Sequence, residues 1–134
     1  MATNKANVVV QININPQPEE HEVTAAWILA RHFGITIEFL KPIDGYKLKT
    51  PDINMNGIEW ELKSPTGHSK TTISNNLIIA KLQSPNIVFD TRRTTIPDIK
   101  IHSELSRYLA QRKSISRILM ITKDEKVLEI QKKR

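Results

Sequence analysis

Hydrophobic and polar positions along the chain recur with two periods, and each change of period marks the boundary of an element. Where apolar and polar residues alternate, the pattern predicts a half-buried strand; where apolar residues recur every three or four positions, it predicts an amphipathic helix. The pattern predicts helices over residues 19–33, 71–83 and 96–113, and strands over residues 8–14, 35–40, 46–55, 58–64, 86–90, 117–122 and 126–130. This order predicts an α/β (α+β) fold with a central mixed sheet flanked by helices.

The same pattern predicts which faces of these elements are buried. Residues 86–90 are almost all apolar, which is typical of a strand buried on both faces. The apolar stripes expected to face the core are Ile73, Leu77, Ile78 and Leu82 in the second helix, and Ile99, Ile101, Leu105, Tyr108 and Leu109 in the third. We expect one domain over residues 19–134, preceded by an extension over residues 1–18 that carries a candidate extra strand.

Asn56-Gly57, between two strand-like segments, is the strongest short-range signal for a two-residue hairpin turn. With this turn Asp52 faces Glu61, and side chains that face one another in this way have Cβ atoms about 4.5–5.5 Å apart. Alternation puts Glu59, Glu61 and Lys63 on the outer face of the second strand. Two carboxylates so close destabilise a fold unless a cation compensates them, and Mg²⁺ prefers such oxygen ligands. The hairpin therefore predicts a metal site, although this charge pattern also occurs on plain solvated strand faces.

The composition favours a basic protein with an anionic partner, since the net charge is +6 and the pI is near 9.7. Lys70, Arg92 and Arg93 stand in predicted loops, where they are candidates for contacts to nucleic-acid phosphates. Aromatic residues make up only 5% of the chain, which favours such contacts over base stacking. The lack of cysteine excludes disulfides, thiolate zinc sites and cysteine nucleophiles. No apolar run approaches the ~18 residues of a membrane span and residues 1–7 are polar, so we expect neither membrane insertion nor a signal peptide.

Pro51-Asp52 and Glu61-Leu62-Lys63, set in the element order αβββαβ, resemble the signature of the PD-(D/E)xK nucleases. Within that superfamily, residues 20–121 resemble the C-terminal tRNase domains of bacterial contact-dependent growth inhibition toxins. The other residues that carry this resemblance are Glu22, Leu29-Ala30, Gly34, Trp60 and Gln83-Ser84-Pro85-Asn86-Ile87-Val88. The resemblance implies a restriction-endonuclease-like core.

The resemblance also implies roles for individual residues. Asp52 and Glu61 would bind a divalent metal, Mg²⁺ with Mn²⁺ or Zn²⁺ as alternatives, and Lys63 would assist the attacking water. A glutamate of the first helix would join them, with Glu22 as the first candidate and Glu20 as the second. Stabilisation of the helix dipole would explain an acidic first turn equally well. Two further candidates near the site are Gln83, and Glu59 as a competing ligand.

We therefore expect a metal-dependent endonuclease that cleaves tRNA in the cytoplasm of a target cell, as a toxin neutralised by an acidic immunity protein. The chain would be either a free-standing relative or an excised toxin domain. Three alternatives stay open. A DNA endonuclease of the restriction or repair type would use the same site, a metal-independent RNase would use a histidine such as His68 as acid or base, and a non-catalytic module would bind nucleic acid or a protein. Because unmetallated carboxylates repel phosphate, the acidic pair favours an enzyme over the binding module.

Overall fold

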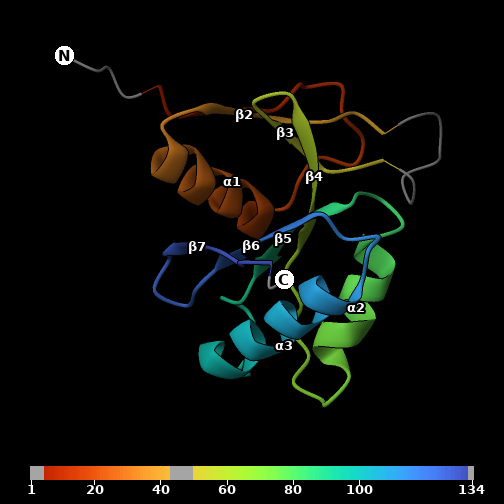
Figure 1. The fold of residues 1–134 in the computed structure, drawn as a ribbon. Coiled ribbons are helices and arrows are strands. Elements are labelled where there is room, and N and C mark those ends of the chain that lie inside the picture. Colours follow the sequence, from red (N-terminus) through yellow and green to blue (C-terminus); the bar gives the residue numbers. More distant parts are fainter. Residues whose placement is uncertain (1–4, 43–49, 133–134) are drawn as a thin grey trace.

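The computed structural model describes residues 5–42 and 50–132, and the elements in these residues follow the predicted order (Figure 1). The helices are α1 (Glu20–Phe33), α2 (Thr72–Ala80) and α3 (Asp98–Gln111). The strands are β1 (Asn7–Val9), β2 (Thr36–Phe39), β3 (Ile53–Met55), β4 (Ile58–Lys63), β5 (Asn86–Asp90), β6 (Arg117–Ile121) and β7 (Val127–Glu129). The run α1, β2, β3, β4, α2, β5 confirms the αβββαβ order. Residues 46–49 of the predicted third strand lie outside the described residues.

The strands form one sheet in which the spatial order follows the chain, from β1 to β7. β2, β3 and β4 are antiparallel neighbours, as are β6 and β7, whereas β1 with β2, β4 with β5, and β5 with β6 are parallel. A helix bridges each parallel pair, because a parallel connection must cross back over the sheet. Since β4 and β5 run in parallel, their carboxyl ends meet at one edge of the sheet, where Lys63 and Asp90 are the last strand residues.

Two apolar clusters, one on each face of the sheet, form the core. α1 covers the first face and α2 with α3 covers the second (Figure 1). β5 contributes Val88 to the first cluster and Ile87 and Phe89 to the second, which confirms that this strand is buried on both faces. Each such side chain stabilises the fold by about 1.5–3 kcal/mol through its removal from water. Helices therefore cover both faces of the central part of the sheet.

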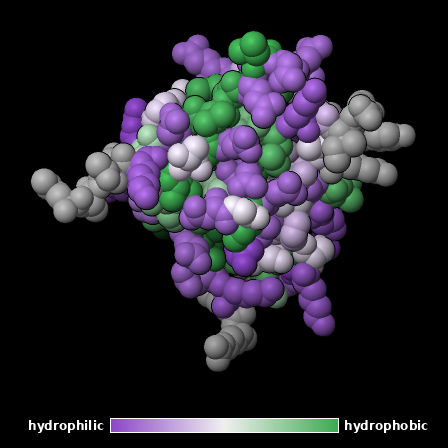
Figure 2. All heavy atoms as spheres, turned by 90° about the horizontal axis from the view of Figure 1, so that it is seen from above, coloured by the Kyte–Doolittle hydropathy of each residue, from purple (hydrophilic) through white to green (hydrophobic). Residues whose placement is uncertain are grey.

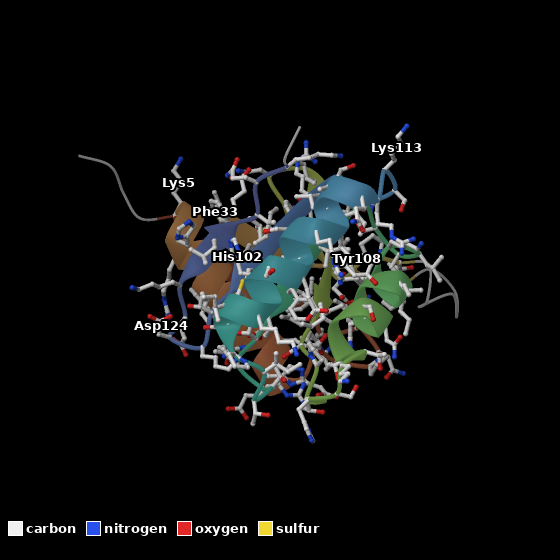
Figure 3. The ribbon with its side chains drawn as sticks, turned by 60° about the horizontal axis from the view of Figure 1, so that its bottom comes forward. Lys5, Phe33, His102, Tyr108, Lys113 and Asp124 are labelled. Atoms are coloured by element: carbon white, nitrogen blue, oxygen red, sulfur yellow. The ribbon has the colours of Figure 1, made fainter. Side chains whose placement is uncertain are left out.

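The predicted apolar stripe of α3 is right except for its first member. Ile101, Leu105 and Leu109 are buried, and Tyr108 packs against the same cluster. Ile99 is instead 83% exposed, because it lies two residues before Ile101 and thus about 200° around a helix of 3.6 residues per turn. In Figure 3, Tyr108 lies on the side of α3 that faces α2.

The stripe of α2 is also partly wrong. Its buried face consists of Ile73, Leu77 and Ala80, which turns Ile78 to the surface with 43% of its area exposed. The helix ends at Ala80, three residues before the predicted end at residue 83, so that Leu82 lies beyond it and is 71% exposed. The prediction placed too many apolar residues on one side of a short helix.

The strand predicted over residues 8–14 is shorter and begins earlier, as β1 pairs with β2 only over Asn7–Val9. After it the chain folds back, and the side-chain amide of Gln17 donates hydrogen bonds to the carbonyls of Gln11, Ile12 and Ile14. Ile14 is 5% exposed and belongs to the first apolar cluster. This segment therefore packs on the same core as α1.

The face of the molecule seen from above is largely hydrophilic, with its apolar side chains in separate groups (Figure 2). Scattered apolar residues of this kind are normal on a folded protein. Among the described residues, no helix combines the length and the apolar character that a crossing of the bilayer requires.

Candidate active site

The hairpin between β3 and β4 has the turn and the register that its sequence predicts. Asn56 and Gly57 both have positive φ, 52° and 82°, as a two-residue turn with the twist of a hairpin requires. Ile53 faces Trp60 and Met55 faces Ile58. The register of the two strands ends at Ile53 and Trp60, and one residue before β3 the Asp52 N–H also donates to the Trp60 carbonyl at 3.0 Å. This bond holds Asp52 against the end of the hairpin, where its carboxylate lies beside Glu61.

The Asp52 carboxylate is fixed against β4, where its Oδ2 accepts the N–H of Leu62 at 2.8 Å. It lies beside the Glu61 carboxyl, close enough to perturb its ionisation. Lys63 completes the group, with its Nζ 3.4 Å from Glu61 Oε2. The structure thus brings together three of the predicted site residues in the order that the alternation of β4 gives.

Glu61 is only 2% exposed, so the prediction of an outer, solvent-facing position for it is wrong. Glu61 is paired with Ile87 of β5, whose side chain belongs to the cluster under α2 and α3, and α2 packs on β4 itself. Burial first, and then the carboxylate of Asp52, raises the pKa of Glu61 to about 9, although Lys63 acts in the opposite direction. Its Oε1 is buried, and no hydrogen-bond donor reaches it within the described part of the chain. At neutral pH this carboxyl therefore either keeps a proton or requires a cation.

Glu22 lies near Asp52, in the helix that covers the other face of the sheet. It lies in the first turn of α1, where its Oε1 accepts the Glu19 N–H at 2.8 Å in a capping box. Glu22 and Asp52 line one cavity of about 40 Å³, which has room for a few waters. Glu20 is exposed. The geometry therefore favours Glu22 over Glu20 and shows that capping uses only one of the Glu22 oxygens.

The oxygen atoms at this site supply only part of the ligands that a hard cation such as Mg²⁺ requires. Asp52 and Glu61 offer carboxylate oxygens, and the unpartnered Oε1 of Glu61 fits a site that a cation would complete. Among the residues that the structure describes, however, no three histidine, aspartate or glutamate side chains lie at metal-holding spacing. Mg²⁺ commonly keeps several water ligands, so two carboxylates with a third acting through water are a sufficient set.

The other predicted residues lie around this pair at varying distance. Glu59 and Gln83 line a separate open groove of about 420 Å³ beside the hairpin. His68 and Lys70 are exposed in the loop before α2. That loop is tied down by the Thr94 hydroxyl, which donates to the Gly67 carbonyl at 2.6 Å. Among the described residues no histidine lies with Asp52 and Glu61 at metal-holding spacing, and the role of His68 as an acid or base stays a prediction.

Arg92 and Arg93 have different surroundings. The Arg92 guanidinium donates to Asp90, with Nη2–Oδ2 at 2.7 Å, and its side chain is only 15% exposed. Arg93 is exposed and reaches the Ser64 carbonyl, one residue beyond Lys63, at 3.2 Å. The internal ion pair makes Arg92 a poor phosphate contact, because its side chain is largely buried and its Nε and Nη2 already donate to Asp90 and His21, while the exposed Arg93 keeps this role open.

Asp90 is not among the site residues predicted from the sequence, yet it ends β5 and is 1% exposed at the edge where β4 also ends. The position of Asp90 in the sequence does indicate a place near the site. Asp90 follows a run of apolar residues predicted to be a buried strand, and the carboxyl ends of neighbouring parallel strands meet at one edge. Its contacts are to Arg92 and, more weakly, to the Ser64 hydroxyl at 3.4 Å. Asp90 thus belongs to the support of the site.

Comparison with known proteins decides the family. The family model of the contact-dependent growth inhibition CdiA C-terminal domain matches residues 49–127, which run from just before Asp52 through the start of β7. The chain belongs to this family. Membership makes it a contact-dependent growth inhibition domain and confirms this part of the resemblance seen in the sequence.

The fold of this CdiA C-terminal domain is similar to that of a chain in a solved structure, the CdiA-CT/CdiI toxin and immunity complex from Burkholderia pseudomallei. The TM-score is 0.65 at 18% sequence identity, and the match covers 92% of this chain and 98% of the other. At this identity the likeness establishes the fold alone. A search of curated proteins gave no match. The PD-(D/E)xK signature and its chemistry stay predictions.

Proposed function

We propose that this CdiA C-terminal domain is a divalent-metal-dependent endonuclease that cleaves tRNA and thereby stops the growth of the cell that receives it. The observation that carries the proposal is the buried Glu61 carboxyl with the half-buried Asp52 carboxylate and Lys63 beside it. Placing a second carboxylate against a buried one is unfavourable, and the hydrogen bond that Asp52 accepts from Leu62 does not require a glutamate at position 61. Strongly perturbed ionisable groups in such positions are typical of active sites.

Asp52 and Glu61 would hold the metal, Mg²⁺ or else Mn²⁺ or Zn²⁺, and Glu22 would bind it through water in the cavity that it shares with Asp52. A bound divalent ion supplies a Lewis acid that polarises the phosphate and lowers the pKa of water. Lys63 holds its ammonium 3.4 Å from Glu61, where it can orient the attacking water and stabilise the charge that develops on the phosphate. The covered sheet edge keeps these charges in a medium that strengthens their interactions.

The choice of tRNA rests on the resemblance to tRNase domains. The net charge of +6 suits a nucleic acid, and Arg93 and Lys70 are exposed cations near the ends of β5 and β4, where they would contact the phosphate backbone. Such contacts would make binding weaker as the salt concentration rises. They do not distinguish ribose from deoxyribose, which leaves that choice to experiment.

The test is a cleavage assay on total tRNA with Mg²⁺ or with EDTA, and with duplex DNA alongside. Glu61→Gln keeps the shape of the buried side chain and removes the carboxylate, while Glu59→Gln makes the same change at an exposed position of the same strand. We expect discrete tRNA fragments from wild type and Glu59→Gln that need Mg²⁺, and none from Glu61→Gln. Cleavage of the duplex DNA but not of the tRNA would show that the substrate is DNA. Cleavage by Glu61→Gln at the wild-type rate would overturn the site.

A cognate immunity protein of acidic character is part of the proposal. The similar solved structure is a toxin and immunity complex, and a domain of net charge +6 would associate fastest with an acidic partner. Expression in the bacterial cytoplasm tests where the domain acts. We expect growth arrest with wild type and normal growth with Glu61→Gln. Equal arrest by both would separate growth inhibition from the proposed chemistry.

A further inference from the structure

The two arginines that follow β5 reach across to the first turn of α1. The Arg92 Nη2 donates to the His21 carbonyl at 2.9 Å, although 71 residues separate the two in the chain. Arg93 approaches the ring of the same residue, with its Nη1 2.7 Å from His21 Nε2. Because arginine is always a donor, this His21 nitrogen must be the acceptor, which leaves the Nδ1 proton to face Glu19 Oε2 at 3.3 Å.

The Arg92 side chain can hold the His21 carbonyl in place because its own guanidinium is held by Asp90. Its Nε lies 2.9 Å from Asp90 Oδ1 and its Nη2 lies 2.7 Å from Asp90 Oδ2, a two-point contact that sets the plane of the guanidinium. Asp90 also accepts the Arg92 N–H at 3.0 Å and is 1% exposed at the end of β5. The end of β5 is thus tied to the backbone of α1 through one rigid side chain.

The residue that follows His21 is Glu22, whose side chain lines the cavity beside Asp52. We infer that Arg92 is a positioning residue: held by Asp90, it binds the His21 carbonyl and so sets the side chain of Glu22 toward Asp52 in the cavity that the two share. The inference rests on the proposed function, because it gives Glu22 a share in binding the metal. It also replaces the predicted role of Arg92 as a phosphate contact.

An ion pair that only stabilises the fold would show the same contacts between Arg92 and Asp90, but its loss would have a different effect. α1 is already secured by its capping box and by buried residues such as Leu29, so the contact with Arg92 adds orientation at the first turn more than attachment of the helix. Residues that orient a ligand of a metal typically change its affinity by about 10–100-fold when they are replaced. Loss of an ion pair that only stabilises the fold would lower stability and leave the affinity of the folded protein unchanged.

The test is calorimetric titration of Mn²⁺ into the purified domain without nucleic acid, for wild type, Glu22→Gln, Arg92→Lys and the double variant. Lysine keeps the charge and loses the two-point contact. We expect Arg92→Lys and Glu22→Gln each to weaken Mn²⁺ binding about tenfold, and the double variant to be no weaker than Glu22→Gln alone. Arg107→Lys, at an exposed ion pair on α3, is the matched control and should bind as wild type does.

The outcomes separate this inference from the proposed function. Wild-type affinity in Arg92→Lys, or losses that add fully in the double variant, would overturn the positioning role and leave the metal site standing. Absence of Mn²⁺ binding by wild type would overturn both. Circular dichroism checks the fold of each variant. If Arg92→Lys does not fold, Asp90→Asn removes the other half of the same two-point contact and must show the same loss of affinity.

Discussion

The N–H of Leu62 donates to Asp52 Oδ2 at 2.8 Å, and this one hydrogen bond joins the hairpin register to the candidate active site. The Asp52 N–H is bonded in turn to the carbonyl of Trp60. Both neighbours of Glu61 in β4 are therefore bonded to Asp52, which holds the Asp52 carboxylate and the backbone of Glu61 side by side. The site is as rigid as the strand pairing that builds it, which is what a preorganised catalytic group needs.

Replacing Asp52 should separate its structural role from its chemical one. Asp52→Asn keeps an oxygen that can accept the Leu62 N–H, so we expect a fold close to wild type and a loss of metal-dependent cleavage of at least about 100-fold. Asp52→Ala loses the hydrogen bond as well and should cost about 1 kcal/mol of stability in addition. Urea denaturation and the tRNA assay measure the two effects. Equal cleavage by Asp52→Asn and wild type would remove Asp52 from the site.

The raised pKa of Glu61 predicts that the metal-free protein becomes less stable as the pH rises. In the unfolded chain this carboxyl has its ordinary pKa of 4.5, whereas in the folded protein its pKa is about 9. Between these values the folded state holds a proton that the unfolded state has released, so stability falls with increasing pH. The slope from this one group is at most about 1.4 kcal/mol per pH unit. Below pH 4.5 the group should have no further effect.

Comparison with Glu61→Gln isolates this contribution. Urea midpoints in EDTA at pH 6 and pH 8.5 should fall for wild type and change much less for the variant, which has no proton to lose at this position. Glu61→Gln should therefore be the more stable protein at pH 8.5 despite lacking activity. Added Mg²⁺ should raise the midpoint of wild type only, since ligands stabilise the state that binds them. Parallel pH curves for the two proteins would contradict the assignment.

Lys63 should act on the reaction more than on metal binding. Its side chain is 20% exposed and its Nζ lies 3.4 Å from Glu61 Oε2, so it faces the pair without being enclosed by it. We expect Lys63→Met to lower the cleavage rate by about 100-fold or more and to change Mn²⁺ affinity only a few-fold. Lys63→Arg restores the charge and should recover part of the rate. An unchanged rate in Lys63→Met would leave the lysine as an ordinary partner of Glu61.

The parts of this site that sequence could predict are those fixed by local chain geometry. Asn56-Gly57 determines the turn, the turn determines the register as far as Ile53 and Trp60, and Asp52 follows directly, bonded to the Trp60 carbonyl. The burial of Glu61 is not predictable in this way, because it depends on how α2 packs on β4. The contact between Arg92 and the His21 carbonyl is still less local, since no periodicity links positions 71 residues apart.

The buried faces of the helices also depend on neighbouring elements. The spacing of apolar residues predicts that a helix forms, but it does not determine how the helix is rotated about its axis against the sheet. Leu77, Leu105 and Leu109 are buried as predicted, whereas Ile78 and Ile99 are turned outward by the packing of the two helices on each other and on the sheet. The pattern predicts Ile78 and Ile99 to lie within the apolar stripes, whereas the structure places both at the surface. Only the position of neighbouring elements could have corrected this.

Ile99 and Ile101 of α3 allow a direct check of that rotation with one chemical change at two positions. Ile101 is fully buried and Ile99 is 83% exposed. Ile101→Ala should lower the free energy of unfolding by about 2–5 kcal/mol, because it removes buried methyl groups and leaves a cavity. Ile99→Ala should stay within about 0.5 kcal/mol of wild type, since alanine loses no packing there and favours the helix. Urea denaturation of the two variants measures the difference. Similar losses at both positions would mean that Ile99 is covered in solution, by a second copy or by a different rotation of α3.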